Sequence, residues 1–220
     1  MTYTLKLKNE VTIDFEAMKN IFLNHRVFVF GYGSLLYPPG WRGRNMAKIT
    51  GQDDLIECCV RGYRRGPFGI YSPGDKSVVP GLHFYGVVEA SRLRKINGVI
   101  NEIPTLKDWV GLMKTECVFG LGNMFYGDYN ADIECRSYNY RVVDITDNIT
   151  DIELPPNAVV HMVANEATNE QLWKRHRPAK NYYTDVLKGV TKFRSPKFRS
   201  AFLKSGGISY VQQLKFRTTA

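Results

Sequence analysis

The pattern of apolar and polar residues predicts short strands in the first part of the chain, interrupted by one helix. Residues 2–7 alternate between polar and apolar side chains, and residues 27–30 form a short apolar run. Between these two strands, residues 14–24 carry apolar side chains at helical spacing. Short apolar runs bounded by turn residues predict further strands over residues 55–63, 68–71 and 82–88.

The second part of the chain is predicted to mix helices and strands without a regular order. A helix is expected over residues 89–100, and another over residues 105–116 with Thr105 as its N-cap. Strands are predicted over residues 134–145 and 158–164, and helices over residues 168–176 and 182–190. The pair Ser195-Pro196 is typical of a helix start, and Gly206-Gly207 would end this last helix.

The order of the predicted elements indicates an α+β fold, with a mixed sheet or small β-barrel against which helices pack. A doubly wound parallel sheet would require a regular alternation of strands and helices, which is absent. The 220 residues, of which 44% are hydrophobic, suffice for one domain with an elaboration. We therefore expect a domain over residues 1–190, followed by a basic C-terminal helix or tail over residues 191–220.

Positive charge is concentrated near the C-terminus. The net charge is +9, and residues 189–220 contain seven Lys or Arg and no Asp or Glu, which leaves +2 for the rest of the chain. The tetrapeptide KFRS occurs at residues 192–195 and again at 197–200. Alternating basic and aromatic residues would suit a nucleic acid or an acidic protein partner. The cations concerned are Lys192, Arg194, Lys197 and Arg199.

A second interpretation of the same segment is an amphipathic helix that packs on the domain. Its three phenylalanines would then join the core, while the charged side chains would face solvent. The phenylalanines are Phe193, Phe198 and Phe202. We favour this interpretation, because runs of charged residues usually form solvated faces.

Cysteine and histidine positions do not indicate a metal site or a disulfide framework. Cys58 and Cys59 are adjacent, Cys117 and Cys135 stand apart, and no CxxC pair exists. The four histidines show no spacing typical of metal ligands. No apolar run approaches the ~20 residues of a membrane helix, and the N-terminus lacks a signal-peptide pattern. We expect a cytoplasmic protein with reduced cysteines and no metal site.

The segment FGYGSLL, residues 30–36, follows a predicted strand and carries two glycines. It is no dinucleotide-binding loop, because Leu36 stands where a third glycine is needed, and no Walker lysine follows. It is no nucleophile elbow, because Tyr32 replaces the first glycine of that motif. Two interpretations remain: a turn required by sterics, or a loop whose backbone N–H groups hold an anion beside the hydroxyls of Tyr32 and Ser34.

Several segments resemble the γ-glutamylcyclotransferase family. VFVFGYGSL (27–35) is similar to the strand and loop that bind the γ-glutamyl group in that family, and FGYGSLLYPPGW (30–41) looks most like its ChaC-type, glutathione-degrading branch. CCVRGYRRGPFGIYS (58–72) and VPGLHFYGVV (79–88) are similar to later segments of that branch. PAKNYYTDVL (178–187) looks like its last helix, whereas the KFRS segments have no counterpart.

This resemblance implies an enzyme that releases 5-oxoproline from glutathione or another γ-glutamyl compound without a cofactor. It implies substrate binding by the loop and by one tyrosine downstream. These residues are Tyr32, Gly33, Ser34, Leu35 and Tyr126. It also implies one catalytic carboxylate, for which Glu116 in LMKTE is the candidate and Glu102 the alternative. The segment between residues 88 and 116 is longer than the family pattern.

Two other hypotheses remain open from the sequence. The chain could be a binding module that keeps the loop but has lost the catalytic glutamate, with the basic tail as its contact surface. Alternatively, Ser34 could act as a nucleophile with a histidine. No histidine in the sequence has a recognisable partner pattern, so the last hypothesis has little support.

Overall fold

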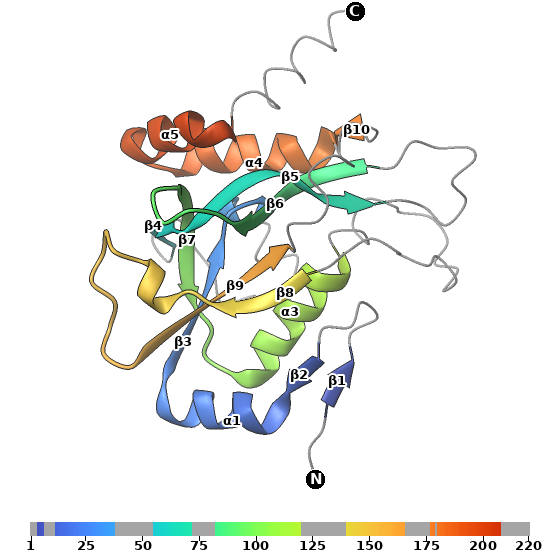
Figure 1. The fold of residues 1–220 in the computed structure, drawn as a ribbon, viewed down its shortest axis with the longest axis vertical. Helices are drawn as coiled ribbons and strands as arrows, with labels where there is room; N and C mark the ends of the chain where they lie inside the picture. Colours follow the sequence, from blue (N-terminus) through green and yellow to red (C-terminus); the bar gives the residue numbers. More distant parts are fainter. Residues whose placement is uncertain are drawn as a thin grey trace, which may run out of the picture.

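The computed structural model describes seven stretches of the chain. These are residues 4–6, 12–37, 55–71, 82–119, 140–165, 177–178 and 180–207. Their helices and strands are arranged as Figure 1 shows. Within these stretches, no helix is both long and apolar enough to cross a membrane. The helix predicted over residues 168–176 lies outside them.

A mixed five-stranded sheet forms the centre of the fold. Its strands, in spatial order, are β4 (Ile56–Arg61), β7 (Lys95–Glu102), β3 (Arg26–Gly31), β9 (Ala158–Asn165) and β8 (Tyr140–Asp144). Strands β3 and β9 are parallel, and the other neighbours are antiparallel. The prediction of an α+β fold with a mixed sheet is therefore confirmed.

A second sheet lies beside the first. Strands β5 (Tyr63–Tyr71) and β6 (Leu82–Glu89) are antiparallel, and β10 (Arg177–Pro178) adds to β6 in parallel. The side chain of Asn165 at the end of β9 accepts a hydrogen bond from Val87 N of β6 at 3.2 Å. The described strands do not close into a barrel. A small hairpin of β1 (Thr4–Lys6) and β2 (Thr12–Asp14) precedes the central sheet.

The alternation of side chains along β3 divides the core into two clusters. Val27 and Val29 belong to the first cluster, which includes residues of the helices, and Phe28 and Phe30 belong to the second. All four side chains are at most 2% exposed. Strand β3 is thus covered on both faces, which explains why its sequence is a continuous apolar run.

Four α-helices pack against these sheets within the described residues. They are α1 (Phe15–Asn24), α3 (Leu106–Phe119), α4 (Lys180–Phe193) and α5 (Pro196–Phe202). Helices α4 and α5 lie at one end of the molecule with β5 and β6, and α1 and α3 lie toward the opposite end (Figure 1). The predicted caps are confirmed: Thr105 Oγ1 accepts from Asp108 N at 3.1 Å, and Ser195 Oγ accepts from Phe198 N at 3.1 Å.

The helix predicted over residues 89–100 is wrong. Residues after β6 form a short turn, in which Arg94 N donates to the carbonyl of Ser91, and β7 follows. Strand β7 lies between β3 and β4, and its residues 98–101 are buried in succession. A strand that is covered on both faces loses the alternating pattern, so its short apolar run cannot be told from a helix by periodicity.

The basic C-terminal segment packs into the core through residues of α4 and α5. Helix α4 continues through the boundary predicted between residues 190 and 191. Phe198 and Phe202 are 3% and 2% exposed and belong to the first cluster, while the ring of Phe193 lies 5.5 Å from that of Tyr37. Ser195 N and Oγ donate to the carboxylate of Glu57 at 2.7 and 2.6 Å. The interpretation as a docking helix is confirmed for Phe198 and Phe202, whereas Phe193 is only half-buried and belongs to neither core cluster.

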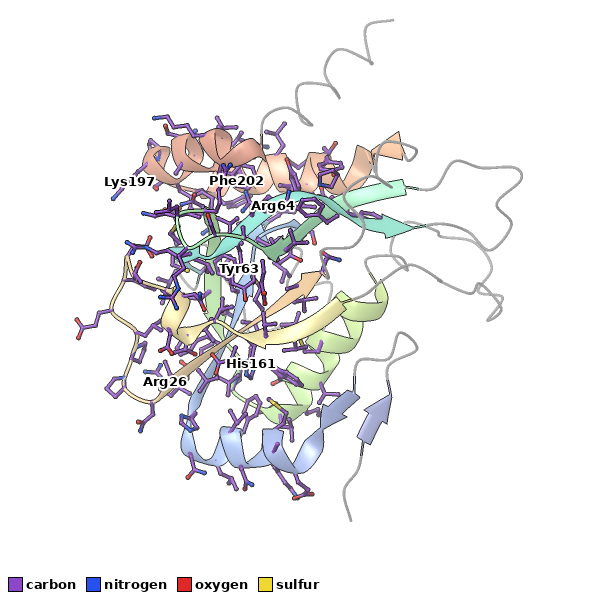
Figure 2. All side chains as sticks on the ribbon, viewed as in Figure 1. Arg26, Tyr63, Arg64, His161, Lys197 and Phe202 are labelled. Atoms are coloured by element: carbon purple, nitrogen blue, oxygen red, sulfur yellow. The ribbon has the colours of Figure 1, made fainter. Side chains whose placement is uncertain are left out.

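The structure gives no support to a nucleic-acid contact by this segment. Arg194, one of the four predicted contacts, is only 4% exposed and faces the protein interior. Arg199 is half-buried. Lys192 and Lys197 are exposed, and Figure 2 shows Lys197 on the outer side of α5. The buried arginine therefore cannot reach a phosphate backbone without unpacking the helix.

Replacing a buried phenylalanine of α5 tests this assignment. We expect Phe198→Ala to lower the free energy of unfolding of the whole domain by about 3–5 kcal/mol, because it leaves a cavity in the first cluster. The neighbouring Lys197→Ala removes an exposed side chain and should change it by less than about 0.5 kcal/mol. Urea unfolding followed by circular dichroism measures both. A separate, weak transition for the C-terminal helices, with the main transition unchanged, would contradict this packing.

Candidate functional site

The loop predicted to bind a ligand begins where β3 ends. Tyr32 and Gly33 follow the strand, and a 3₁₀ turn over Ser34–Leu36 comes next. Leu36 N donates to the carbonyl of Gly33 at 3.0 Å, and Tyr37 N donates to that of Ser34 at 3.1 Å. The side chains of Leu35 and Leu36 are 3% and 0% exposed. The loop is therefore anchored in the core immediately after its two polar residues.

Gly33 is held against a tyrosine of α4. A Cβ atom at this position would lie 2.1 Å from Tyr182 Oη, which is far closer than real side-chain contacts. This contact by itself excludes a side chain at position 33, so glycine is required there. Tyr182 Oη also donates a long hydrogen bond, 3.4 Å, to the carbonyl of Tyr85 on β6.

A buried arginine on β5 lies beside this contact. Arg65 is 7% exposed, and its Nη2 donates to the carbonyl of Asn97 on β7. Its guanidinium carbon lies 4.1 Å from the ring centroid of Phe202 and 5.7 Å from that of Tyr85. Within the described part of the chain, Nε and Nη1 have no hydrogen-bond partner. Arg65 thus keeps donors for another group.

The charge of Arg65 is close to the phenol groups of the loop and α4. Burial lowers the pKa of Arg65 to about 10, and the phenols of Tyr85, Tyr182 and Tyr32 oppose this shift. The guanidinium therefore remains protonated at neutral pH. No ion pair of Arg65 with a carboxylate exists among the described residues. A full positive charge is held here between aromatic rings without a counter-ion from these stretches.

Three features therefore meet at the end of β3: a fixed glycine loop, phenolic hydroxyls and a buried cation. Apolar rings around a charge strengthen its attraction for an opposite charge, because water no longer screens it. Hydrogen bonds from an arginine to a carboxylate are among the strong ones in proteins. The arrangement suits a small anionic ligand that carries a carbonyl or amide group.

The structure places the predicted binding residues unevenly. Tyr32 is half-buried, with its ring 6.5 Å from that of Phe30, and Ser34 is also half-buried. Leu35 faces the core, so only its backbone can contact a ligand. Glu116 lies on α3, but its side chain is outside the described part of the structure. Tyr126 lies outside the described residues.

The alternative carboxylate, Glu102, lies away from the loop. It pairs with Arg26, whose Nε and Nη2 donate to Oε1 at 2.9 Å and Oε2 at 2.5 Å. This ion pair lowers the pKa of Glu102 and makes it a weaker base. Glu102 is opposite Phe28 in the ladder, and Gly31 lies three residues further along β3, roughly 10 Å away. In Figure 2, Arg26 is near the opposite end of the molecule from Phe202.

The two described histidine side chains do not support Ser34 as a nucleophile. His161 on β9 is opposite Val29 on β3. Its ring centroid lies 5.6 Å from that of Trp109, and the two ring planes make an angle of 67°. Its Nδ1 has no hydrogen-bond partner within the described residues. Burial lowers the pKa of His161. His25 is exposed at the start of β3. Both histidines therefore precede the loop by several residues along the sheet.

Sequence reasoning missed Arg65, Tyr85 and Tyr182 as members of this site. A signal for Arg65 existed in the sequence: Arg64 and Arg65 are adjacent in a strand, and alternation requires one of them to face inward. Figure 2 labels Arg64, the neighbour on the other face. Tyr85 on β6 and Tyr182 on α4 had no comparable signal in the spacing of their neighbours, because only contacts between distant elements bring these residues together.

Comparison with known proteins finds a similar fold in several solved structures. No family model and no curated protein sequence matches the chain. A γ-glutamyl cyclotransferase is 13% identical, with a TM-score of 0.47 and coverage of 87% of each chain. The protein YkqA from Bacillus subtilis is 16% identical, with a TM-score of 0.49 and coverage of 95% of this chain and 70% of its own.

A third similar structure is the yeast γ-glutamyl cyclotransferase specific to glutathione. It is 11% identical, with a TM-score of 0.46, and the match covers 85% of this chain and 97% of the yeast chain. The function of this chain must be inferred from its own residues.

A methyl group at Gly33 tests the contact with Tyr182. We expect Gly33→Ala to lower the free energy of unfolding by about 1–3 kcal/mol, because the new Cβ collides with Oη. In a Tyr182→Phe background the loss should be smaller, since the next atom, Cζ, is 3.2 Å away. Gly111→Ala on α3, where a Cβ meets nothing within 4 Å, is the control and should cause no loss. Strictly additive losses in the double variant would disprove the contact.

Acid should destabilise the fold partly through His161. Because burial lowers its folded-state pKa below the unfolded value of roughly 6.5, the unfolded state binds the proton more readily. Stability contributed by neutral His161 is therefore present above the unfolded pKa of roughly 6.5 and is lost as the pH falls through the lower folded-state pKa. His161→Asn should flatten this loss in urea titrations at pH 7.5, 6.5 and 5.5. The exposed His25→Asn is the control, and an unchanged slope in His161→Asn would contradict the prediction.

Proposed function

We propose that the protein is a γ-glutamylcyclotransferase that releases 5-oxoproline from glutathione or another γ-glutamyl compound. The observation that carries this proposal is the convergence of Gly33, the hydroxyl of Tyr182 and the buried cation of Arg65 at the end of β3. The loop there is the segment by which the sequence resembles the family. Its surroundings suit a ligand that carries both a carboxylate and an amide, as a γ-glutamyl group does.

The reaction is an intramolecular acyl transfer. The nitrogen of the substrate α-amine attacks its own γ-carbonyl carbon, and the new C–N bond closes a five-membered lactam. The bond to the departing amine breaks, and the proton lost by the attacking nitrogen is delivered to the leaving nitrogen. No water or redox partner enters the balance. The protein must hold the flexible chain in a folded conformation, remove one proton and stabilise an oxyanion.

A general base is required because an α-amine titrates at roughly 7.7–8.0 and is mostly protonated at neutral pH. We assign this role to Glu116. It lies on the helical face that also carries Trp109, Leu112 and Met113, each at most 1% exposed. A carboxylate that enters such surroundings has a raised pKa and becomes a better base.

The course of α3 along the sheet supports this assignment. Ile103 N donates to the carbonyl of Val27 at 2.8 Å, just before the helix begins. Six residues later, Trp109 packs against His161, which is opposite Val29. The helix therefore advances along the molecule in the direction in which β3 runs. Its C-terminal end approaches the same end of the molecule as the loop.

The distances along both elements agree. Glu116 follows Trp109 by seven residues, roughly 10 Å at 1.5 Å per residue. Tyr32 follows Val29 by three residues, roughly 10 Å at 3.3 Å per residue. The base on α3 and the loop after β3 would therefore lie equally far along the molecule and would flank one ligand. Backbone N–H groups of the loop are suited to hold the oxyanion that forms on attack, a contribution of roughly 10²–10³-fold per donor.

The decisive experiment is incubation of the purified protein with glutathione, γ-glutamyl dipeptides and glutamine, followed by measurement of 5-oxoproline. We expect release from at least one compound, and Glu116→Gln should reduce it roughly 10²–10⁴-fold, as loss of a general base does. Circular dichroism would verify that the variant is folded.

Glu102→Gln is the matched control, because it removes a carboxylate that pairs with Arg26 and lies away from the loop. It should retain activity within a few-fold. Loss of release in Glu102→Gln with retention in Glu116→Gln would assign the base to Glu102. No release from any compound at high protein concentration would overturn the proposed activity and favour a binding module.

A further inference from the structure

The unpaired guanidinium of Arg65 is the feature that the catalytic scheme leaves unused. An arginine carries five N–H donors, and among the described residues only Nη2 of Arg65 has an acceptor, the carbonyl of Asn97. The group is nevertheless 93% buried, since its exposed fraction is 7%. Buried charges in proteins are ordinarily paired, because desolvation of an unpaired charge is costly. A partner for this charge is therefore expected.

We propose that Arg65 binds the α-carboxylate of the γ-glutamyl group and thereby selects substrates that carry it. This inference rests on the proposed function. Nε and Nη1 lie on opposite edges of the guanidinium, and the second N–H of Nη2 lies beside one of them. That neighbouring pair can donate the two parallel hydrogen bonds with which arginine binds a carboxylate. Phe202 and Tyr85 cover the guanidinium with their rings and shield such a pair from water.

The position of Arg65 favours contact with the γ-glutamyl half of the substrate, which is the same in all such compounds. Its charge is within electrostatic reach of Tyr32 and Tyr182, and Tyr182 Oη touches Gly33. A ligand carbonyl at the loop backbone would therefore lie beside the cation. The α-carboxylate is common to all γ-glutamyl compounds, whereas the departing amine varies. A fixed buried arginine suits the constant part, and a neutral ligand would leave its charge unpaired.

Binding of a ligand that cannot cyclise tests this inference without turnover. The monoamide of glutaric acid has the γ-amide and the carboxylate but lacks the α-amine, and glutaramide replaces its carboxylate with a neutral amide. By calorimetry, we expect the wild-type protein to bind the monoamide roughly 10²-fold more tightly, as for a buried charge pair. Arg65→Met should abolish the preference, and Arg65→Lys should keep part of it.

Arg64→Met is the matched control. It removes the same charge one residue earlier, from the other face of β5, where Arg64 lies 4.9 Å from the ring centroid of Phe68. The preference for the carboxylate should survive in this variant. A purely structural role of Arg65 would change the melting temperature without changing the ratio of the two affinities. A folded Arg65→Met protein that keeps the full preference would overturn the proposal.

Turnover separates this inference from the proposed activity. With γ-glutamyl substrates, Arg65→Met should raise KM roughly 10²-fold. With a substrate analogue whose α-carboxylate is replaced by a neutral amide, the variant and the wild type should have the same kcat/KM. A preference in binding without any release of 5-oxoproline would support the Arg65 site and reject the activity. Release without a carboxylate preference would reject the Arg65 site alone. If the Arg65-dependent preference required a carboxylate on the departing amine instead of the α-carboxylate, the assignment would also be overturned.

Arg65→Met could fail to fold, and the wild-type protein then still decides the matter. Equal binding of the monoamide and glutaramide to the wild type would contradict the proposal. A roughly 10²-fold difference that Arg65→Lys reduces would support it. The melting temperature of each variant, measured first, identifies which proteins enter the comparison.

Discussion

The close approach of α4 to the loop after β3 is the contact on which the proposed site depends. Two glycines permit it. A Cβ at Gly33 would meet Tyr182 Oη at 2.1 Å, and a Cβ at Gly189 would meet the backbone of Leu36 at 2.6 Å. Larger residues at either position would push the helix away from the loop. The helix brings a hydroxyl to the loop and, through α5, supplies the ring that covers Arg65.

The C-terminal segment therefore has a different role from the one its charge pattern suggests. Phe202 is a core residue, and its ring centroid lies 4.1 Å from the Arg65 guanidinium carbon. Glu57 of β4 fixes the junction of α4 and α5 through two hydrogen bonds to Ser195. Because the wall of the site is built from the last helices, binding at Arg65 and the packing of these helices should be linked energetically.

Local signals in the sequence predicted most elements, whereas contacts between distant elements were beyond them. Thr105 and Ser195 cap helices as expected, and the apolar run of β3 ends in the expected loop. Strand β7 was mistaken for a helix because burial on both faces removes the alternation that identifies a strand. Arg65 and Tyr182 lie more than a hundred residues apart, so only the folded chain brings them together.

The proposed roles of Arg65 and Glu116 constrain one another. If Arg65 holds the α-carboxylate from the side of β5 and α5, the amine on the same carbon is fixed in orientation. A base can then remove the proton of this amine only from a direction that keeps the γ-carbonyl in contact with the loop. In the central sheet, β9 lies on the other side of β3 from β7 and β4. Helix α3 packs on β9. A base from that helix would reach the amine without competing with Arg65 for the carboxylate, so that cation and base act on two groups of one carbon atom.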